Sequence, residues 1–263
     1  MTPLNRAHAS LSLLLLVALM VPLLTGASCQ PKPDDKDKEQ ALLHYDMGVQ
    51  AYQNGDMRGA LMEQQAAVKQ DPELDLAHNA LGLLYHVSYG DKEKAIFHYK
   101  RALEINPKFS EAYTNLGNVY QNEGRYDDAI PLYEKALSDI LYKTPYVAEN
   151  NLGWCYYKKG QLQQAIDHIK SALVPNPKFC LGHRNLGTIY SETNQPDKAL
   201  LAFAQFAKYC PDVPDAHYRY GRALLEQKDT EGARREFGQC VEKAKGQPAG
   251  EDCQRLLDQL SAP

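Results

Sequence analysis

The sequence has no strong excess of charge of either sign. Among its 263 residues, Lys and Arg number 29 and Asp and Glu number 33, which gives a net charge of −4. No segment carries a stripe of Lys and Arg, although such a stripe is the usual electrostatic signature of a nucleic-acid-binding protein. We therefore set nucleic acid aside as a partner.

Motifs for catalysis and for metal binding are also missing. The sequence contains no H-E-x-x-H, no paired-cysteine metal spacing, no P-loop and no glycine-rich dinucleotide motif. No Ser or Cys lies in a known nucleophile signature. Four of the eight histidines share one position, four residues before a regularly spaced glycine, which predicts packing rather than metal binding: His44, His78, His183 and His217. We predict no enzymatic activity, no cofactor, no metal and no small-molecule substrate.

The apolar stretch at residues 11–24 is too short to span a bilayer comfortably. Arg6 precedes it, and the small residues TGAS and then Cys29 follow it. A basic start, an apolar core and small residues predict a secretory signal at residues 1–28. With Cys29 directly behind it, the segment resembles the lipobox of bacterial lipoproteins, although a plain signal peptide with a chance cysteine is the alternative. The resemblance implies acyl chains on Cys29. It also implies a place on the periplasmic face of the outer membrane, because residue 30 is Gln rather than Asp.

Residues 29–40 contain two Pro and seven charged residues, and beyond Cys29 they contain no apolar side chain. Such a segment cannot bury enough apolar surface to fold. We therefore predict that residues 29–40 form a disordered tether between the lipid and a folded domain.

From residue 41 onward, glycine and alanine recur with a nearly constant period. The glycines are Gly48, Gly82, Gly117, Gly153, Gly187 and Gly221. The alanines are Ala60, Ala95, Ala129, Ala165, Ala199 and Ala233. This period of about 34 residues resembles the tetratricopeptide repeat, in which two antiparallel helices make one unit. We expect an all-α solenoid, with glycine and alanine where the helices cross and with Gly55, Gly124, Gly160 and Asn194 in the turns.

The period divides residues 41–246 into six units, and residues 247–263 are predicted to form a cap helix. The units span residues 41–74, 75–109, 110–145, 146–179, 180–213 and 214–246. Prolines that cannot continue a helix close most units. The third unit is longer than the others because it carries extra residues at 139–145 (DILYKTP). A tolerated surface insertion is one explanation of this difference.

A second explanation combines the insertion with the lipobox, the tether and six repeats. Together these features resemble the type IV pilus biogenesis lipoproteins, the pilotins that help the outer-membrane secretin assemble. The matching residues are Asp139, Leu141, Tyr142, Pro145, Glu149 and Asn150. The resemblance implies that the secretin is the partner and that the protein promotes its multimerisation. The alternative is a scaffold lipoprotein for β-barrel insertion or cell-wall synthesis. We also expect Leu141 and Tyr142 to plug a gap between two three-repeat halves.

Repeats of this kind bind partners in a concave groove lined by their first helices, and several groove positions here are apolar or aromatic. The third unit is polar at Thr114, Asn118 and Gln121. The candidate groove residues are Leu42, Tyr45, Val49, Tyr52, Leu76, Asn79, Leu83, His86, Asn118, Asn150, Trp154 and Tyr157. A solvated surface rarely holds so many apolar side chains. The groove therefore suits an amphipathic or extended peptide, unless a flanking segment covers it.

Five cysteines follow Cys29, and an exported protein can form disulfides. Cys180 opens a first helix and Cys210 closes the second helix of the same unit, so antiparallel packing would bring them within bridging range. Cys240 and Cys253 could likewise join the last repeat to the cap helix. Cys155 lies at a small packing position, and we expect it to be buried and free.

Overall fold

The computed structural model describes residues 33–244, 246 and 248–261. The predicted signal peptide and Cys29 lie outside these residues. Pro33–Pro263 forms one compact unit, and its described regular elements are all helical. This confirms the predicted all-α solenoid.

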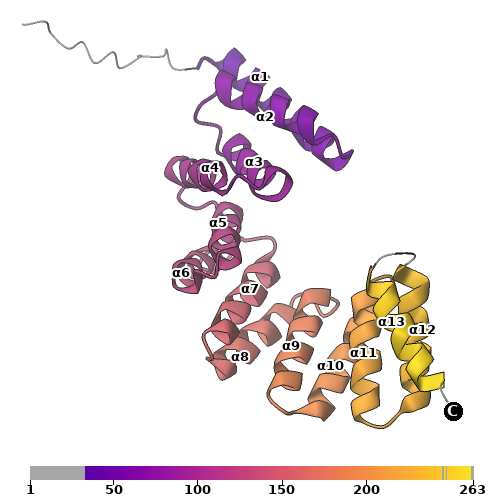
Figure 1. Cartoon of the computed structure of the whole chain (residues 1–263). Coiled ribbons are helices and arrows are strands. Elements are labelled where there is room, and N and C mark those ends of the chain that lie inside the picture. The colour runs from indigo at the N-terminus through magenta and orange to yellow at the C-terminus, as the bar shows by residue number, and fades with distance from the viewer. Residues whose placement is uncertain (1–32, 245, 247, 262–263) are drawn as a thin grey trace, which may run out of the picture. The chain divides into compact units, whose positions relative to one another are not determined.

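The helices pair in the order that the glycine period predicts (Figure 1). The first three pairs are α1 (Asp35–Gln53) with α2 (Met57–Gln70), α3 (Asp75–Leu83) with α4 (Lys92–Ile105), and α5 (Ser110–Asn122) with α6 (Tyr126–Leu137). The last three are α7 (Pro145–Lys158) with α8 (Leu162–Leu173), α9 (Cys180–Glu192) with α10 (Pro196–Tyr209), and α11 (Pro214–Glu226) with α12 (Thr230–Ala244). The predicted cap helix is α13 (Pro248–Ser261), which packs on α12.

The turn inside each pair needs a left-handed backbone. Gly55, Gly124 and Gly160 adopt positive φ there, and Asn194 takes the same position in the fifth repeat with φ of 56°. Glycine and asparagine tolerate this conformation at little cost. The sixth repeat uses Lys228 instead, with φ of 64°.

Each repeat glycine lies against one side chain of its second helix. A Cβ added at any of the six would come within 3.0 Å of that side chain, so only glycine lets the helices approach so closely. The six facing side chains, which we name the crossing residues, are Gln64, Tyr99, Tyr133, Ile169, Phe203 and Phe237. The six predicted alanines of the second helices are fully buried beside them.

The predicted tether is partly wrong, because α1 begins at Asp35 rather than after residue 40. Asp34 accepts a hydrogen bond from the Asp37 amide, and the Asp37 side chain accepts one from the Asp34 amide. This capping box satisfies two amides that the start of a helix leaves unpaired. The local hydrogen bonds therefore extend the helix into a segment that has almost nothing to bury.

The second repeat contains a feature that the sequence did not reveal. Helix α3 continues into a π-helix, η1 (Leu84–Tyr89), which ends at Gly90 with φ of 67°. A π-turn holds one residue more than the α-helical path, and this repeat is one residue longer than 34. The widened turn places the Tyr89 hydroxyl 3.2 Å from the Met57 carbonyl oxygen of the preceding repeat.

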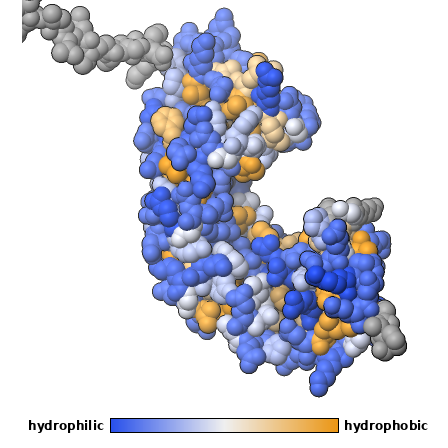
Figure 2. Space-filling view, viewed as in Figure 1, coloured by the Kyte–Doolittle hydropathy of each residue, from blue (hydrophilic) through white to orange (hydrophobic). Residues whose placement is uncertain are grey.

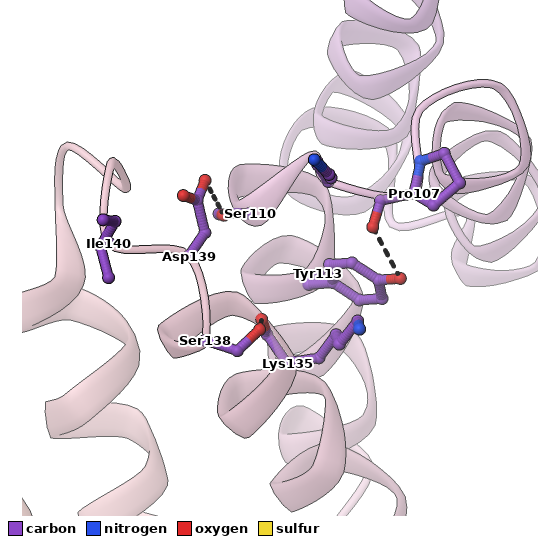
Figure 3. Close-up of a pocket in the computed structure, with 8 residues that line it drawn as sticks. Pro107, Ser110, Tyr113, Lys135, Ser138, Asp139 and Ile140 are labelled. Carbon is purple, nitrogen blue, oxygen red and sulfur yellow. Dashed lines mark hydrogen bonds between the residues drawn. The ribbon is translucent and has the colours of Figure 1, made fainter.

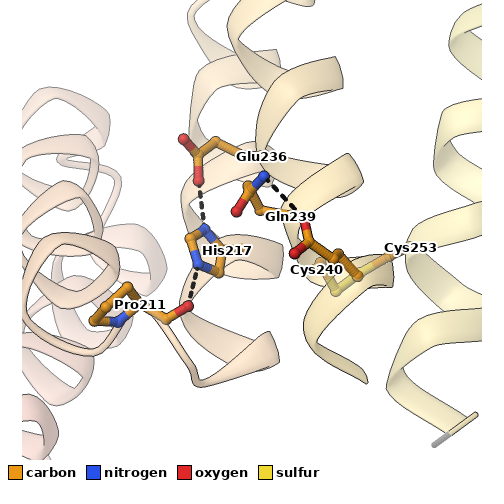
Figure 4. Close-up of polar contacts among 7 residues, drawn as sticks. Pro211, His217, Glu236, Gln239, Cys240 and Cys253 are labelled. Atoms are coloured by element: carbon orange, nitrogen blue, oxygen red, sulfur yellow. Dashed lines mark hydrogen bonds and ion pairs between the residues drawn. A yellow bond between two sulfur atoms is a disulfide. The ribbon is translucent and has the colours of Figure 1, made fainter. Parts of the chain in front are cut away.

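The shared histidine position packs against the second helix, as predicted, in all four repeats with a histidine there. His44 Nδ1 lies 2.7 Å from Glu63, and His217 Nδ1 lies 2.7 Å from Glu236 (Figure 4). The fourth repeat reverses the pair, because Glu149 on α7 contacts His168 on α8 at 2.7 Å. In the second repeat both partners are histidines, with His78 Nδ1 and His98 Nδ1 3.1 Å apart. In the fifth, His183 stacks on Tyr209 at the end of α10 and contacts the Pro177 carbonyl oxygen.

The cysteines pair as the sequence analysis suggested. Cys180 is joined to Cys210, and Cys240 is joined to Cys253, whose bond connects α12 to α13 (Figure 4). Cys155 is free and buried, and burial raises the pKa of its thiol to about 12. Such a thiol stays protonated and unreactive at neutral pH.

Candidate functional site

The first helices of the first two repeats form a groove with apolar walls. Tyr45, Val49 and Tyr52 on α1 face Leu76 and Leu83 on α3 across a cavity of about 170 Å³. Gly48 and Gln64 lie at its base. Figure 2 shows hydrophobic side chains gathered over this part of the molecule. We name this surface the N-terminal groove.

A second pocket, of about 430 Å³, continues the groove toward the third repeat. It shares Tyr45, Leu76 and Asn79 with the first pocket and adds Phe109, the last residue of the second repeat, and Glu111 of the third. The inserted loop supplies the rest of its wall: Asp139, Leu141, Tyr142 and Lys143. The residues that lengthen the third repeat therefore form one end of the N-terminal groove.

The predicted plug by Leu141 and Tyr142 is half right. Tyr142 is 8% exposed, and its hydroxyl lies 2.9 Å from that of Thr114, so this ring does fill the space between α5 and the loop. Thr114 is consequently buried rather than facing the groove. Leu141 is 81% exposed and Ile140 is 96% exposed, because the Leu141 amide turns back to donate to Asp139.

Asp139 holds the other side of the loop to the third repeat. It accepts a hydrogen bond from the Ser110 hydroxyl at the start of α5 (Figure 3). Ser110, Tyr113, Lys135 and Ile140 line a further depression of about 430 Å³ there. The loop thus stands between this depression and the N-terminal groove.

Two polar atoms beneath the N-terminal groove have no hydrogen-bond partner among the described residues. They are Gln64 Oε1, on a side chain that is 1% exposed, and the hydroxyl of the fully buried Tyr99. In the third repeat the equivalent hydroxyl of Tyr133 donates to Asn118 and Gln121. The second repeat has Leu83 and His86 at those two positions, and Tyr99 is therefore left unpaired. An unpaired buried polar group costs about 1–3 kcal/mol, which makes these two atoms a notable feature of the groove.

Carboxylates surround the same groove. The pKa of Tyr45 is raised mainly by burial and further by Asp46 and Asp75. The pKa of Tyr142 is likewise raised by burial, and the nearby Glu111 carboxylate adds to the increase. The groove therefore combines apolar walls with a negative rim.

Asparagines connect neighbouring first helices, although Asn79 also lines the N-terminal groove. Asn115 donates to Asn79, Asn151 to Asn118, and Asn185 to Asn150. Asn150 is only 2% exposed, so its predicted role as a groove residue is wrong. The amide pairs hold consecutive repeats together, which is a role that exposure patterns alone do not reveal.

The remaining predicted groove residues do not all join the N-terminal groove. Leu42 is exposed beside Leu43 in a separate depression. His86 Nε2 accepts a hydrogen bond from the Asn122 side-chain amide at 3.0 Å. Trp154 and Tyr157 are half-buried on α7 with ring centroids 5.0 Å apart, and Lys158 lies over both rings. They form a separate aromatic cluster further along the row of repeats.

The described parts of the chain contain no helix that is long and apolar enough to cross a membrane. They also contain no group of three or more His, Cys, Asp or Glu side chains arranged to hold a metal ion. These two findings concern the described residues alone.

Comparison with known proteins agrees with this geometry. Residues 109–173 and 184–248 match tetratricopeptide repeat families, and residues 87–124 match a related repeat family. The chain is a tetratricopeptide-repeat protein. Among curated proteins it is 26% identical over 194 residues to the BBSome complex member BBS4 of Bos taurus, and 34% identical over 95 residues to the photosystem I assembly protein Ycf3 of Prochlorococcus marinus. It spans only 37% and 55% of these two relatives.

Two solved structures match over nearly their whole length. PilW, described as a widely conserved type IV pilus biogenesis factor, has a TM-score of 0.73 at 22% identity, covering 81% of this chain and 98% of PilW. PilF of Pseudomonas aeruginosa has a TM-score of 0.72 at 19% identity, covering 84% of this chain and 99% of PilF. At such identities the similarity demonstrates a shared fold alone.

Proposed function

We propose that this tetratricopeptide-repeat protein is an outer-membrane lipoprotein that binds the type IV pilus secretin through the N-terminal groove and promotes its assembly. The observation that carries the proposal is the groove itself, with its apolar walls and an end formed by the inserted loop. The lipobox-like sequence at Cys29 and the full-length fold similarity to PilW and PilF support it. The two disulfides suit an exported protein.

The groove suits an extended or amphipathic segment of a partner. Tyr45 and Tyr52 lie two helical turns apart on α1, so both rings can contact one ligand. Leu83 from α3 lines the opposite wall. None of the three is a crossing residue, and their truncation should leave the helix pairs intact.

The test replaces Tyr45, Tyr52 and Leu83 by Ala in cells and measures heat-resistant secretin oligomers. Buried aromatic anchors each contribute about 2 kcal/mol or more to an interface, so oligomers and pili should be lost while circular dichroism stays helical. A matched control replaces Met62, Phe97 and Leu201 by Ala, because these are also exposed apolar residues but lie on second helices. Normal oligomers in the groove variant would place the binding surface elsewhere.

Membrane attachment is tested separately with Cys29→Ser. Each buried CH₂ of an acyl chain contributes about 0.8 kcal/mol, and loss of the acyl chains should leave a soluble or unprocessed protein. Fractionation and labelling with a radioactive fatty acid measure this. A variant that still incorporates label and stays with the membrane would refute lipidation at Cys29.

A further inference from the structure

The carboxylates around the N-terminal groove lack cationic partners. Asp46, Asp75, Glu111 and Asp139 form no ion pair within 4.0 Å in the described part of the chain, although ion pairs occur elsewhere on the molecule. Asp75 accepts a hydrogen bond from the neutral Asn106 amide, and Asp139 accepts one from Ser110. Among the residues lining the two pockets, Lys143 is the single cation, against the carboxylates Glu111 and Asp139. Asp46 and Asp75 lie outside this lining but close enough to raise the pKa of Tyr45, behind the effect of burial, and Asp46 shares a separate depression with Lys36. The rim therefore has a net negative charge.

A second observation is independent of these charges. Gln64 lines the base of the groove, is 1% exposed, and donates its Nε2 hydrogen to the Tyr45 carbonyl oxygen at 3.0 Å. Its Oε1 atom has no partner among the described residues. Buried polar atoms are normally hydrogen-bonded, and an unpaired one requires an explanation. The rim thus offers carboxylates without a cationic partner, and the base of the groove offers one acceptor, Gln64 Oε1, without a donor among the described residues.

We propose that the N-terminal groove selects an extended partner segment that combines apolar side chains with at least one Lys or Arg. A Lys ammonium has three donors and no acceptor, and an Arg guanidinium has five donors and no acceptor. Their methylene stems can lie along Tyr45, Tyr52 and Leu76 while the charged end meets the rim carboxylates. A neutral or acidic segment would leave the rim carboxylates without a cationic partner.

This inference deepens the proposed function and rests on it in taking the N-terminal groove as the partner site. It adds the chemical class of the bound segment, which apolar walls alone do not specify. The inference and the function can fail separately, because the groove's sequence preference can be measured without the secretin.

The experiment selects a phage-displayed random peptide library on the purified mature chain with its disulfides intact. Peptides that also bind the variant with Tyr45, Tyr52 and Leu83 replaced by Ala are discarded, because they do not depend on the groove. We expect the enriched peptides to combine apolar residues with Lys or Arg. A synthetic peptide of the enriched sequence should bind more weakly as salt increases, since exposed charge pairs are screened.

Matched variants then separate charge from shape. Asp46→Asn with Glu111→Gln removes two rim charges at nearly constant volume, and should weaken that peptide about tenfold. Asp167→Asn removes an exposed carboxylate on α8, far along the chain from the groove, and should leave binding unchanged. Gln64→Met removes the unpaired acceptor at similar volume, together with the Nε2 hydrogen bond to the Tyr45 carbonyl oxygen, and should weaken binding a few-fold while circular dichroism stays helical.

Enriched peptides without Lys or Arg, or equal binding by the rim variant and the wild type, would overturn the inference. Sedimentation measures whether the rim variant changes self-association of the chain. If self-association changes and peptide binding does not, the surface binds a second copy of the chain, and the inference is overturned as well. Enrichment of basic apolar peptides together with no secretin binding would uphold the inference and refute the proposed partner.

Discussion

The first three repeats and the last three repeats use the same helix pair but differ at the crossing residue. In the first half this residue ends in a polar atom: Gln64, Tyr99 and Tyr133. In the second half it is wholly apolar: Ile169, Phe203 and Phe237. Both disulfides also lie in the second half. Among the described residues, the first half thus places two unpaired buried polar atoms, on Gln64 and Tyr99, under a groove, whereas the second half has one, Asn185 Oδ1, and carries the disulfides.

This difference shows how one repeat serves two purposes in the same solenoid. Each repeat contacts only its neighbours, so that stability can vary along the chain. Surfaces that bind or move are usually drawn from the less stable parts of a protein. The unpaired Gln64 and Tyr99 atoms and the π-turn of η1 all occur in the two repeats that form the N-terminal groove.

The largest expected effect comes from removing the disulfide of the fifth repeat. Cys180→Ala with Cys210→Ala opens a loop of 30 residues, and should lower the free energy of unfolding of the second half by about 3–4 kcal/mol. Hydrogen exchange followed by mass spectrometry should show faster exchange in α9–α12 but unchanged exchange in α1–α4. An equal increase of the exchange rate in both halves would contradict the view that their stabilities are independent.

Acid should affect the two halves in opposite directions. Burial and the neighbouring His78 lower the pKa of His98 to about 4, so protonation is disfavoured in the folded state, and stability is lost as pH falls from about 6.5 toward 4. Glu236 raises the pKa of His217, so its contribution is fully present below about pH 6.5 and is lost as pH rises through the raised value.

Lowering the pH from about 7 to about 5 should therefore loosen α3 and α4: their free energy of unfolding should fall by about 1–2 kcal/mol, after allowance for partial solvent screening. Helices α11 and α12 should become slightly more stable. Hydrogen exchange at the two pH values, corrected for the intrinsic rate, measures both changes. His98→Gln should reduce the loosening, leaving the smaller part due to His78, whose pKa is also lowered by burial. An unreduced loosening in that variant would assign the effect to another group.

The smallest expected effect distinguishes two equivalent tyrosines. Tyr133→Phe breaks hydrogen bonds to Asn118 and Gln121, and should cost about 1 kcal/mol. Tyr99→Phe removes a hydroxyl that has no partner, and should be neutral or stabilising by up to about 1 kcal/mol. Urea unfolding of the two variants provides the comparison. A Tyr99→Phe loss as large as that of Tyr133→Phe would show that the Tyr99 hydroxyl is paired.

The sequence was sufficient to predict the solenoid because its glycine period reflects a steric requirement. A Cβ at Gly82 or Gly187 would collide with a ring of the second helix, so the spacing of these residues records the helix crossings directly. The disulfide pairs followed from the same geometry, since antiparallel helices bring Cys180 beside Cys210.

The details of the groove were less predictable because they depend on contacts between repeats. Asn150 occupies a position that faces the groove in the first two units, but its amide is buried against Asn185. Thr114 is likewise covered by Tyr142 from the inserted loop. The early start of α1 depends on hydrogen bonds between Asp34 and Asp37. The composition of this segment had instead predicted disorder.

The central claim is that the partner binds the first half of the solenoid. A photo-crosslinking amino acid placed at Val49 or at Leu83 in cells tests this most directly, with the same amino acid at Met62 and at Leu201 as controls on second helices. The account predicts crosslinked adducts containing the secretin from the two groove positions and none from the controls. Secretin adducts from the control positions alone would contradict it.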